Sequence, residues 1–146
     1  MRLTVQRVSE ASCTVEGELI SSIGQGYMVL VGFSVDDNEE IAKKMAQKLS
    51  KLRVFSDEQG KMNLDIHAVN GEILSISQFT LYGDARKGNR PSFVRALGGP
   101  EAIKLYDYFN QCLREEGLQV KTGIFGADMK IALVNDGPVT IWLEGE

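Results

Sequence analysis

Residues Gly26 to Phe33 read GYMVLVGF, and this stretch decides the fold. The run is continuously apolar, contains β-branched residues and has glycines near both ends. A strand with one face in water alternates apolar and polar residues, whereas an unbroken apolar run is typical of a strand that is covered on both faces. We therefore expect this stretch to be the central strand of a sheet.

Shorter segments with strand character lie upstream of this run. Leu3 to Val8 (LTVQRV) and Ser12 to Glu16 (SCTVE) are rich in β-branched residues and alternate roughly, which predicts two strands. Gly17 follows Glu16 in a predicted hairpin turn, and Glu18 to Ile23 forms the return strand. The N-terminal part of the chain is therefore expected to be a meander.

Two segments show the periodicity of amphipathic helices. The first begins at the capping oxygens of residues 36–38, covers about residues 37–51, and carries apolar residues at Ile41, Met45, Leu49 and Leu52. The second begins at Pro100, is closed by Gly117, and carries apolar residues at Ile103, Tyr106, Phe109, Cys112 and Leu113. We expect two main helices.

Further strands are predicted between and after these helices. Arg53 to Phe55 begins one strand, and Glu72 to Leu81 (EILSISQFTL) forms a strong strand whose last residues are polar. A basic loop, Tyr82 to Pro91, leads into the second helix. The C-terminal part is expected to contain a turn at residues 135–138 among the strands Leu118 to Lys121, Met129 to Val134 and Val139 to Leu143.

The order of these segments predicts an α+β fold in a single domain that spans residues 1–146. Short links between most strands favour a mostly antiparallel sheet, or a partly closed barrel, with two main helices. Trp142 lies on the last predicted strand. If that strand lies at an edge, Trp142 is suited to pairing with a second copy of the chain, and a role as core filler is an equal alternative.

Composition narrows the classes of function. The formal charge of −4 provides no overall attraction to nucleic acid, so any RNA contact must depend on a local basic surface. Cys13 and Cys112 are far apart and are expected to be buried, reduced thiols. His67 is the only histidine, so we expect neither a metal site nor a cofactor. The longest apolar run is too short for a membrane span, and no export signal is visible, which predicts a cytoplasmic protein.

Common enzyme motifs are absent from the sequence, which has no GxSxG elbow, Walker loop, HExxH helix or plausible Cys-His pair. Polar residues concentrate instead at the end of the strand that begins at Glu72, at Ser75, Ser77, Gln78 and Thr80. Ser77 or Thr80 could act as a nucleophile or a hydrogen-bond donor, and backbone amides nearby could hold an oxyanion. No base is predicted beside them, since His67 is better explained as a structural residue.

Two other segments could be either functional or purely structural. The cluster of Arg86, Lys87, Arg90 and Arg95 could contact phosphates, although a solvated loop is the more common explanation. Residues 135–138 (NDGP) have the composition of an ordinary turn. From these residues alone, a trans peptide bond before the proline is expected, because most such bonds are trans.

The motifs SQFTL at residues 77–81 and NDGPVT at residues 135–140 resemble those of the D-aminoacyl-tRNA deacylase family. The resemblance spans nearly the whole chain, through residues 6–8 (QRV), 60–64 (GKMNL), 86–88 (RKG), 90–93 (RPSF) and 125–129 (FGADM). One departure is Ile124, where the family commonly has arginine. A second is the pair Val94 and Arg95, in a region that varies within the family.

The resemblance implies a homodimer that acts on the 3′ end of aminoacyl-tRNA and removes D-amino acids and glycine. The SQFTL segment of one subunit and a cis Gly137-Pro138 peptide of the other would share each pocket, with Arg7 holding the Gly-Pro turn. Gln78, Phe79 and Met129 would form the pocket walls. A locked backbone would then exclude L side chains while admitting hydrogen or a D side chain.

The resemblance also implies a mechanism without cofactor or metal. Attack by water, assisted by the ribose 2′-hydroxyl and by backbone amides around Phe79 and Thr80, is expected, and Thr80 as a covalent nucleophile is the competing hypothesis. A generic esterase that uses Ser77 or Thr80 is a further alternative. From a different class, a non-catalytic RNA- or nucleotide-binding module would keep the pocket without turnover. Neither a membrane nor a DNA partner is expected.

Overall fold

The structure is a computed structural model that describes residues 1–145. Its secondary-structure elements, in chain order, are β1 (Arg2–Val15), β2 (Glu18–Ile23), β3 (Gly26–Gly32), α1 (Glu39–Lys51), β4 (Phe55–Ser56), β5 (Met62–Leu64), β6 (Glu72–Ser77), the 3-10 helix η1 (Phe79–Tyr82), α2 (Gly99–Glu115), β7 (Gln119–Thr122) and β8 (Lys130–Glu144). No helix within residues 1–145 is both long enough and apolar enough to cross a membrane.

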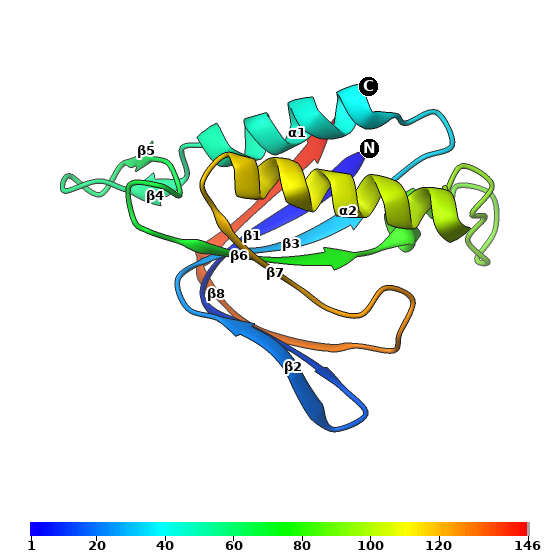
Figure 1. Ribbon diagram of the computed structural model, residues 1–146, viewed down its shortest axis with the longest axis horizontal. Helices are drawn as coiled ribbons and strands as arrows, with labels where there is room; N and C mark the ends of the chain where they lie inside the picture. The colour runs from blue at the N-terminus through cyan, green and yellow to red at the C-terminus, as the bar shows by residue number, and fades with distance from the viewer. Residues whose placement is uncertain (146) are drawn as a thin grey trace.

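The main sheet has the strand order β2-β1-β3-β6-β7, and β8 pairs with β1 (Figure 1). The apolar run quoted above forms β3, which is at the centre of this order and is almost wholly buried, as the sequence predicts. β1 pairs with β3 through residues 2–8 and with β2 through residues 11–15, while β8 follows β1 along nearly its whole length. β8 therefore lies at an edge of the sheet.

The two strand pairs β3·β6 and β6·β7 are parallel, and the other pairs are antiparallel. A parallel pair requires a crossover connection, and α1 and α2 supply these connections on one face of the sheet (Figure 1). The predicted α+β class is confirmed, with two main helices and a mostly antiparallel, curled sheet. Local sequence patterns did not reveal the two parallel pairs.

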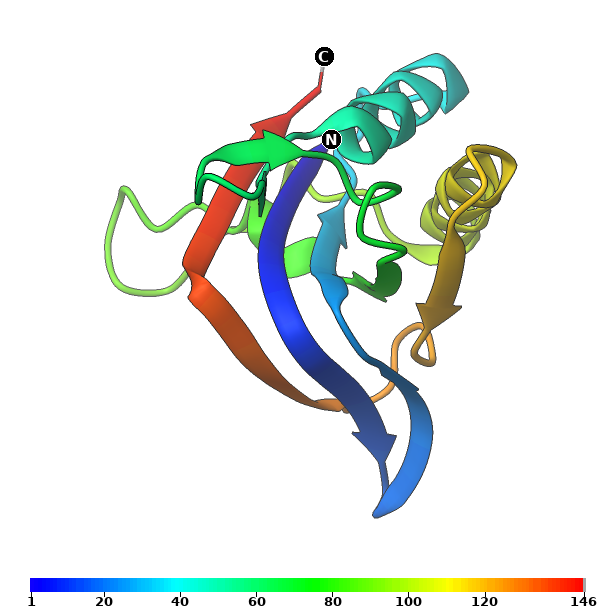
Figure 2. The same cartoon turned by 90° about the vertical axis from the view of Figure 1, so that its left-hand side faces the viewer.

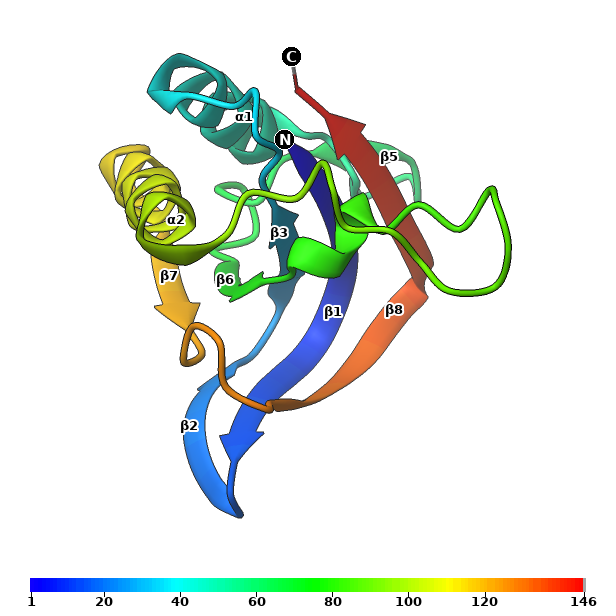
Figure 3. The ribbon, with the colours of Figure 1, turned by 90° about the vertical axis from the view of Figure 1, so that its right-hand side faces the viewer.

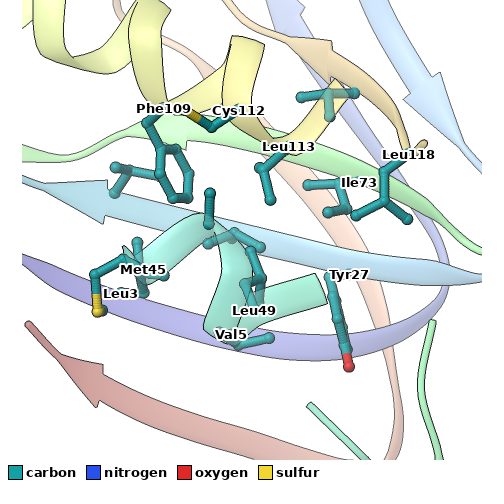
Figure 4. Close-up of a cluster of buried hydrophobic side chains, with 14 of the residues drawn as sticks. Leu3, Val5, Tyr27, Met45, Leu49, Ile73, Phe109, Cys112, Leu113 and Leu118 are labelled. Carbon is teal, nitrogen blue, oxygen red and sulfur yellow. The ribbon is translucent and has the colours of Figure 1, made fainter. Parts of the chain in front are cut away.

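Apolar residues form a cluster on each face of the sheet. The larger one lies beneath α1 and α2, where Leu49 and Phe109 from the helices meet Val5, Tyr27 and Ile73 from the strands (Figure 4). The smaller one lies on the opposite face, which the long strands β1 and β8 curve around (Figure 2). This second cluster includes Val8, Ala11, Cys13, Ile23, Met28, Leu74 and Ile76.

The helices begin and end for local reasons. The side chain of Asn38 caps α1 by accepting a hydrogen bond from the backbone N–H of Ile41 at 3.0 Å, and Glu39 and Glu40 occupy the first turn. α2 has Pro100 in its first turn, where the missing N–H costs nothing, and Gly117 follows its end with a φ of 88°. Both helices match their sequence-based predictions to within about two residues.

Several predicted boundaries are wrong. The two predicted N-terminal strands are one continuous strand, β1, and the strand expected from Arg53 is the short β4. The turn expected at residues 135–138 does not reverse the chain, since these residues lie inside β8. The register between β1 and β8 shifts there, between Gln6 and Val8 and again beyond Val8. A local irregularity within a paired strand thus replaces the expected turn.

The two cysteines are as predicted. Cys13 and Cys112 are both buried and unbridged, and they belong to different clusters. Burial raises the pKa of each thiol because it disfavours the thiolate. These thiols therefore behave as small apolar core residues.

Candidate active site

The site begins where β6 ends. β6 stops at Ser77 rather than continuing to Leu81 as predicted, and Phe79 to Tyr82 form the 3-10 helix η1. The break occurs at Gln78, whose backbone leaves the extended region while its N–H donates to the carbonyl of Val31 at 2.7 Å. The chain leaves the sheet at this turn, so its side chains need not pack in the core and can be polar. This explains why polar residues concentrate at this point of the sequence. Phe79 and Thr80 are exposed as a result.

A cavity of about 310 Å³ opens beside this turn. Ser77, Gln78 and Phe79 form one wall, and Met129, from the loop before β8, forms part of another. The structure therefore brings four of the predicted site residues together, from segments that are about fifty positions apart in the chain. Further apolar side chains of the lining come from β3, β6, α2, β8 and the residues that follow β3 and precede α2: Val31, Phe33, Ile76, Leu97, Ala102 and Ile131.

The same cavity is lined by residues 125–128, which reasoning from residue patterns did not select. They form a loop between β7 and β8, and only their resemblance to the FGADM segment pointed to them. Phe125 packs against Tyr106 of α2, with ring centroids 5.9 Å apart. Asp128 contributes a carboxylate to the rim and lies 3.3 Å from the ammonium of Lys130.

Thr80 lies next to the cavity but does not line it. Its hydroxyl accepts a hydrogen bond from the side-chain amide of Gln78. Within residues 1–145, no histidine or carboxylate is hydrogen-bonded to the hydroxyl of Ser77 or Thr80, so neither has a side-chain base in contact. The site thus lacks the nucleophile and base pair of a catalytic triad.

Backbone N–H groups are available at the same place. The first N–H groups of a helix have no partner inside it. Among the hydrogen bonds of residues 1–145, none engages the N–H of Phe79 or Thr80, whereas those of Leu81 and Gly83 donate to carbonyls of the turn. Two donors beside a cavity can hold a developing negative charge on oxygen.

A second group of predicted residues gathers at the irregular part of β8. Arg7 donates from Nε to the carbonyl of Asp136 at 2.9 Å and from Nη1 to the carbonyl of Val54 at 2.7 Å. The side chain of Asn135 accepts from the N–H of Val139 at 2.7 Å and donates to the side chain of Gln6 at 3.1 Å. These contacts hold the segment on both sides of Gly137 and Pro138.

The Gly137-Pro138 peptide bond is cis, which is the geometry implied by the resemblance and not the one favoured by the residues alone. Both residues are exposed, and neither lines the cavity beside η1. Within one chain, the predicted site residues therefore form two separate groups: Ser77 to Thr80 with Met129, and Arg7 with the Gly-Pro peptide.

A buried polar network fixes the strand behind the cavity. Ser75 donates from its hydroxyl to Asn110 Oδ1 at 2.7 Å, and Tyr106 donates from its hydroxyl to the carbonyl of Ser75 at 2.6 Å. Burial raises the pKa of Tyr106, so its hydroxyl remains a donor. Ser75 thus anchors α2 to β6 and is not accessible to substrate.

The predicted basic loop lies between η1 and α2. Arg86 binds Asp84 through two hydrogen bonds of 2.9 and 2.7 Å, and these hold the pKa of the Asp84 carboxyl down to about 2. His67 lies outside both groups of site residues, in a pocket with Gln25 and Asn70. No group of three or more potential metal ligands occurs within residues 1–145.

Comparison with known sequences identifies the family. The D-Tyr-tRNA(Tyr) deacylase family profile matches residues 4–144. A D-aminoacyl-tRNA deacylase of Bacillus pumilus is 53% identical over 146 residues, which cover 100% of this chain and 99% of the relative. Another of Thermomicrobium roseum is 56% identical over 144 residues, which cover 99% of this chain and 94% of the relative.

Solved structures share the fold over the same extent. The c-Myc DNA Unwinding Element Binding Protein matches with a TM-score of 0.92 at 44% identity, covering 99% of this chain and 98% of its own. A probable eukaryotic D-amino acid tRNA deacylase matches with a TM-score of 0.85 at 18% identity, covering 97% of each chain. With a family profile that spans nearly the whole chain and relatives that share more than half of its residues, the chain belongs to the D-Tyr-tRNA(Tyr) deacylase family of ester hydrolases.

Proposed function

We propose that this protein hydrolyses the ester bond of D-aminoacyl-tRNA and releases the free D-amino acid and the tRNA. The observation that carries this proposal is the cavity between Gln78, Phe79 and Met129, which lies beside the unengaged N–H groups of Phe79 and Thr80. The cavity has the size and the mixed lining of a small-molecule site, and it suits the terminal adenosine with its ester.

In the proposed mechanism, water is the nucleophile. Its oxygen attacks the ester carbonyl, and the N–H groups of Phe79 and Thr80 donate to the resulting oxyanion. The bond from the carbonyl carbon to the ribose oxygen then breaks, and that oxygen takes the proton that the water loses. The adjacent 2′-hydroxyl of the ribose assists this proton transfer. An aminoacyl ester is already activated, so positioning can supply much of the acceleration.

Selection by handedness is assigned to Gly137 and Pro138 of a partner subunit in a homodimer. Support comes from their exposure, from the hydrogen bonds that hold the segment, and from the fact that neither residue lines the cavity of its own chain. A rigid main chain placed near the substrate Cα leaves room for hydrogen or a D side chain and excludes an L side chain. Glycyl-tRNA is then also a substrate, because glycine has no side chain to exclude.

The test is hydrolysis of D-tyrosyl-tRNA with L-tyrosyl-tRNA as the matched control. We expect the D-ester to be cleaved at least about 100-fold faster in kcat/KM, since a steric clash of a side chain with fixed backbone costs several kcal/mol. Glycyl-tRNA is expected to be cleaved and L-alanyl-tRNA to be spared. Equal rates for the two tyrosyl esters would exclude the proposed selection.

A second candidate is a nucleic-acid-binding module without turnover. It is favoured by the structural relative that is described as a DNA unwinding element binding protein. The same assay separates the two, because tight binding of tRNA without D-selective hydrolysis would support the module and remove the enzyme proposal.

A further inference from the structure

An exposed aromatic pair stands at the mouth of the cavity. Phe79 is 54% exposed and Phe93 is 40% exposed, and their ring centroids lie 5.2 Å apart in a T-shaped arrangement. Phe79 belongs to the cavity wall, whereas Phe93 lies outside it. Large aromatic side chains that stay in water beside a ligand site commonly mark a surface that a ligand covers.

The backbone holds Phe93 in this position. Asp84 and Ser92 exchange two backbone hydrogen bonds of 2.8 Å, which closes the neck of the loop between η1 and α2. A Cβ added at Gly83 would lie 3.0 Å from the ring of Phe93, so the ring packs directly over this glycine. The aromatic pair is therefore preorganised, while the loop beyond its neck projects from the body of the protein (Figure 3).

The projecting loop is strongly basic in an acidic protein. Residues 83–95 contain four cationic side chains and one carboxylate, against a formal charge of −4 for the whole chain. Arg86 pairs with Asp84, and Arg95 pairs with Asp36. Lys87 and Arg90 form no ion pair within residues 1–145, and both are exposed. Their charges are available to an anionic partner.

We propose that Phe79 and Phe93 form a stacking platform for the unpaired bases that precede the terminal adenosine, and that Lys87 and Arg90 bind the phosphates of this single strand. Aromatic rings beside a basic surface are the usual means of holding unpaired bases, because every base has a face that stacks. This inference rests on the proposed function and extends its substrate site from one nucleotide to the CCA end of tRNA.

The test compares D-tyrosyl esters of adenosine, of the CCA trinucleotide and of tRNA. In Phe93→Ala, the loss of kcat/KM is expected to be about 10-fold greater for the two longer substrates than for the adenosine ester, as the removal of one stacking contact predicts. Phe93→Tyr should show no such extra loss for the longer substrates, because it keeps the ring. Val94→Ala, a truncation of the exposed neighbour, is the matched control.

The salt dependence tests the phosphate contacts. For Lys87→Ala/Arg90→Ala, the slope of log kcat/KM for tRNA against log salt should become shallower by about 1.4, at about 0.7 per phosphate contact of a single strand. Lys43→Ala/Lys48→Ala removes two exposed cations from α1 and should leave the slope unchanged. An unchanged slope in the loop variant would overturn the phosphate contacts.

Failure of this inference can be distinguished from failure of the proposed function. If Phe93→Ala lowers kcat/KM equally for all three esters, or for none, the proposed stacking platform is excluded, while the wild-type activity still supports the proposed deacylase function. If the wild type cleaves no D-ester, the proposed function fails. Binding of a deacylated RNA that ends in CCA, measured by fluorescence anisotropy, then tests the platform directly, and equal affinity of wild type and Phe93→Ala would overturn it.

Discussion

At the scale of single residues, the chemistry of the site depends on what surrounds the hydroxyl of Thr80. It accepts a hydrogen bond from Gln78, and no base within residues 1–145 accepts its proton. A hydroxyl nucleophile needs such a base at neutral pH. Thr80 is therefore better suited to orient Gln78 than to attack the ester, which agrees with the proposed role of the backbone N–H groups of the turn in holding the oxyanion.

Substitution of Thr80 tests this interpretation. We expect Thr80→Ala to keep the single-turnover rate on D-tyrosyl-tRNA within about 10-fold, because only positioning is lost. A covalent nucleophile would instead cost about 10⁴-fold or more. Thr80→Ser is the matched control, since it keeps a hydroxyl. A trapped acyl-enzyme, or a large loss in Thr80→Ala that Thr80→Ser restores, would establish Thr80 as the nucleophile. Ser77→Ala asks the same question of Ser77.

Some residues of the cavity could be predicted from the sequence, and others could not. Ser77 and Gln78 were visible because polar residues at the end of an apolar strand are unusual. Phe125 and Asp128 lie in a loop whose residues carry no pattern of their own, and only the fold brings them to the cavity. No residue pattern singled out Phe93, because its contact with Phe79 depends on the closed neck of the loop.

At the scale of secondary-structure elements, the position of the turn that follows β6 depends on how α2 is fixed to β6. Tyr106 and Asn110, on one face of α2, bind the carbonyl and the hydroxyl of Ser75, two residues before the end of β6. Both residues and Ser75 are buried, so each polar group needs its partner. The network therefore sets the position of the strand that leads into η1.

Removal of the Tyr106 hydroxyl is expected to destabilise the fold. Tyr106→Phe keeps the ring against Phe125 but leaves the buried carbonyl of Ser75 without this donor, which should lower the free energy of unfolding by about 1–2 kcal/mol. Urea denaturation measures the change. Lys104→Ala, an exposed change on the same helix, should stay within about 0.5 kcal/mol of the wild type. No loss in Tyr106→Phe would show that the network does not hold α2.

Elements with their own local signals were predicted well. α1 and α2 have capping residues and apolar periodicity, and β3 has its continuous apolar run. The parallel pairing of β6 with its neighbours was not visible, because pairing partners are set by long-range packing. Residues 135–138 have the composition of a turn, yet pairing with β1 on both sides keeps the chain in one strand. Tertiary pairing thus overrides local turn preference.

At the scale of the whole molecule, one chain does not bring its two groups of site residues together. The cavity lies beside η1, whereas Gly137 and Pro138 are exposed on the edge strand β8. Trp142, on the same strand, is 50% exposed, so it does not fill the core, and the strand lies at the edge that its alternative role in pairing requires. An exposed edge strand presents unpaired backbone groups with which a second chain can pair. A two-fold dimer that places each Gly-Pro segment at the other subunit's cavity would account for both features.

Mixing two inactive variants tests this arrangement. Phe79→Ala removes part of the cavity wall, and Gly137→Ala adds a Cβ 2.9 Å from Val139 Cγ2 and 3.1 Å from Arg7 Nη2, at a φ of 137°. Each variant alone should be nearly inactive, because both sites of its dimer are damaged. In a mixed dimer one site carries both changes and the other carries neither. Random reassortment should therefore restore about a quarter of the wild-type sites.

The measurement is the activity that the mixture recovers after it is unfolded and refolded together. Mixing the folded variants without refolding is the control, because it shows whether subunits exchange between dimers. Light scattering and thermal denaturation should show that both variants are folded dimers, so that inactivity reports the site. If both groups served one site within the same chain, no mixture could recover activity, because every chain would carry a damaged site. A folded, fully active wild-type monomer would contradict the arrangement more directly still.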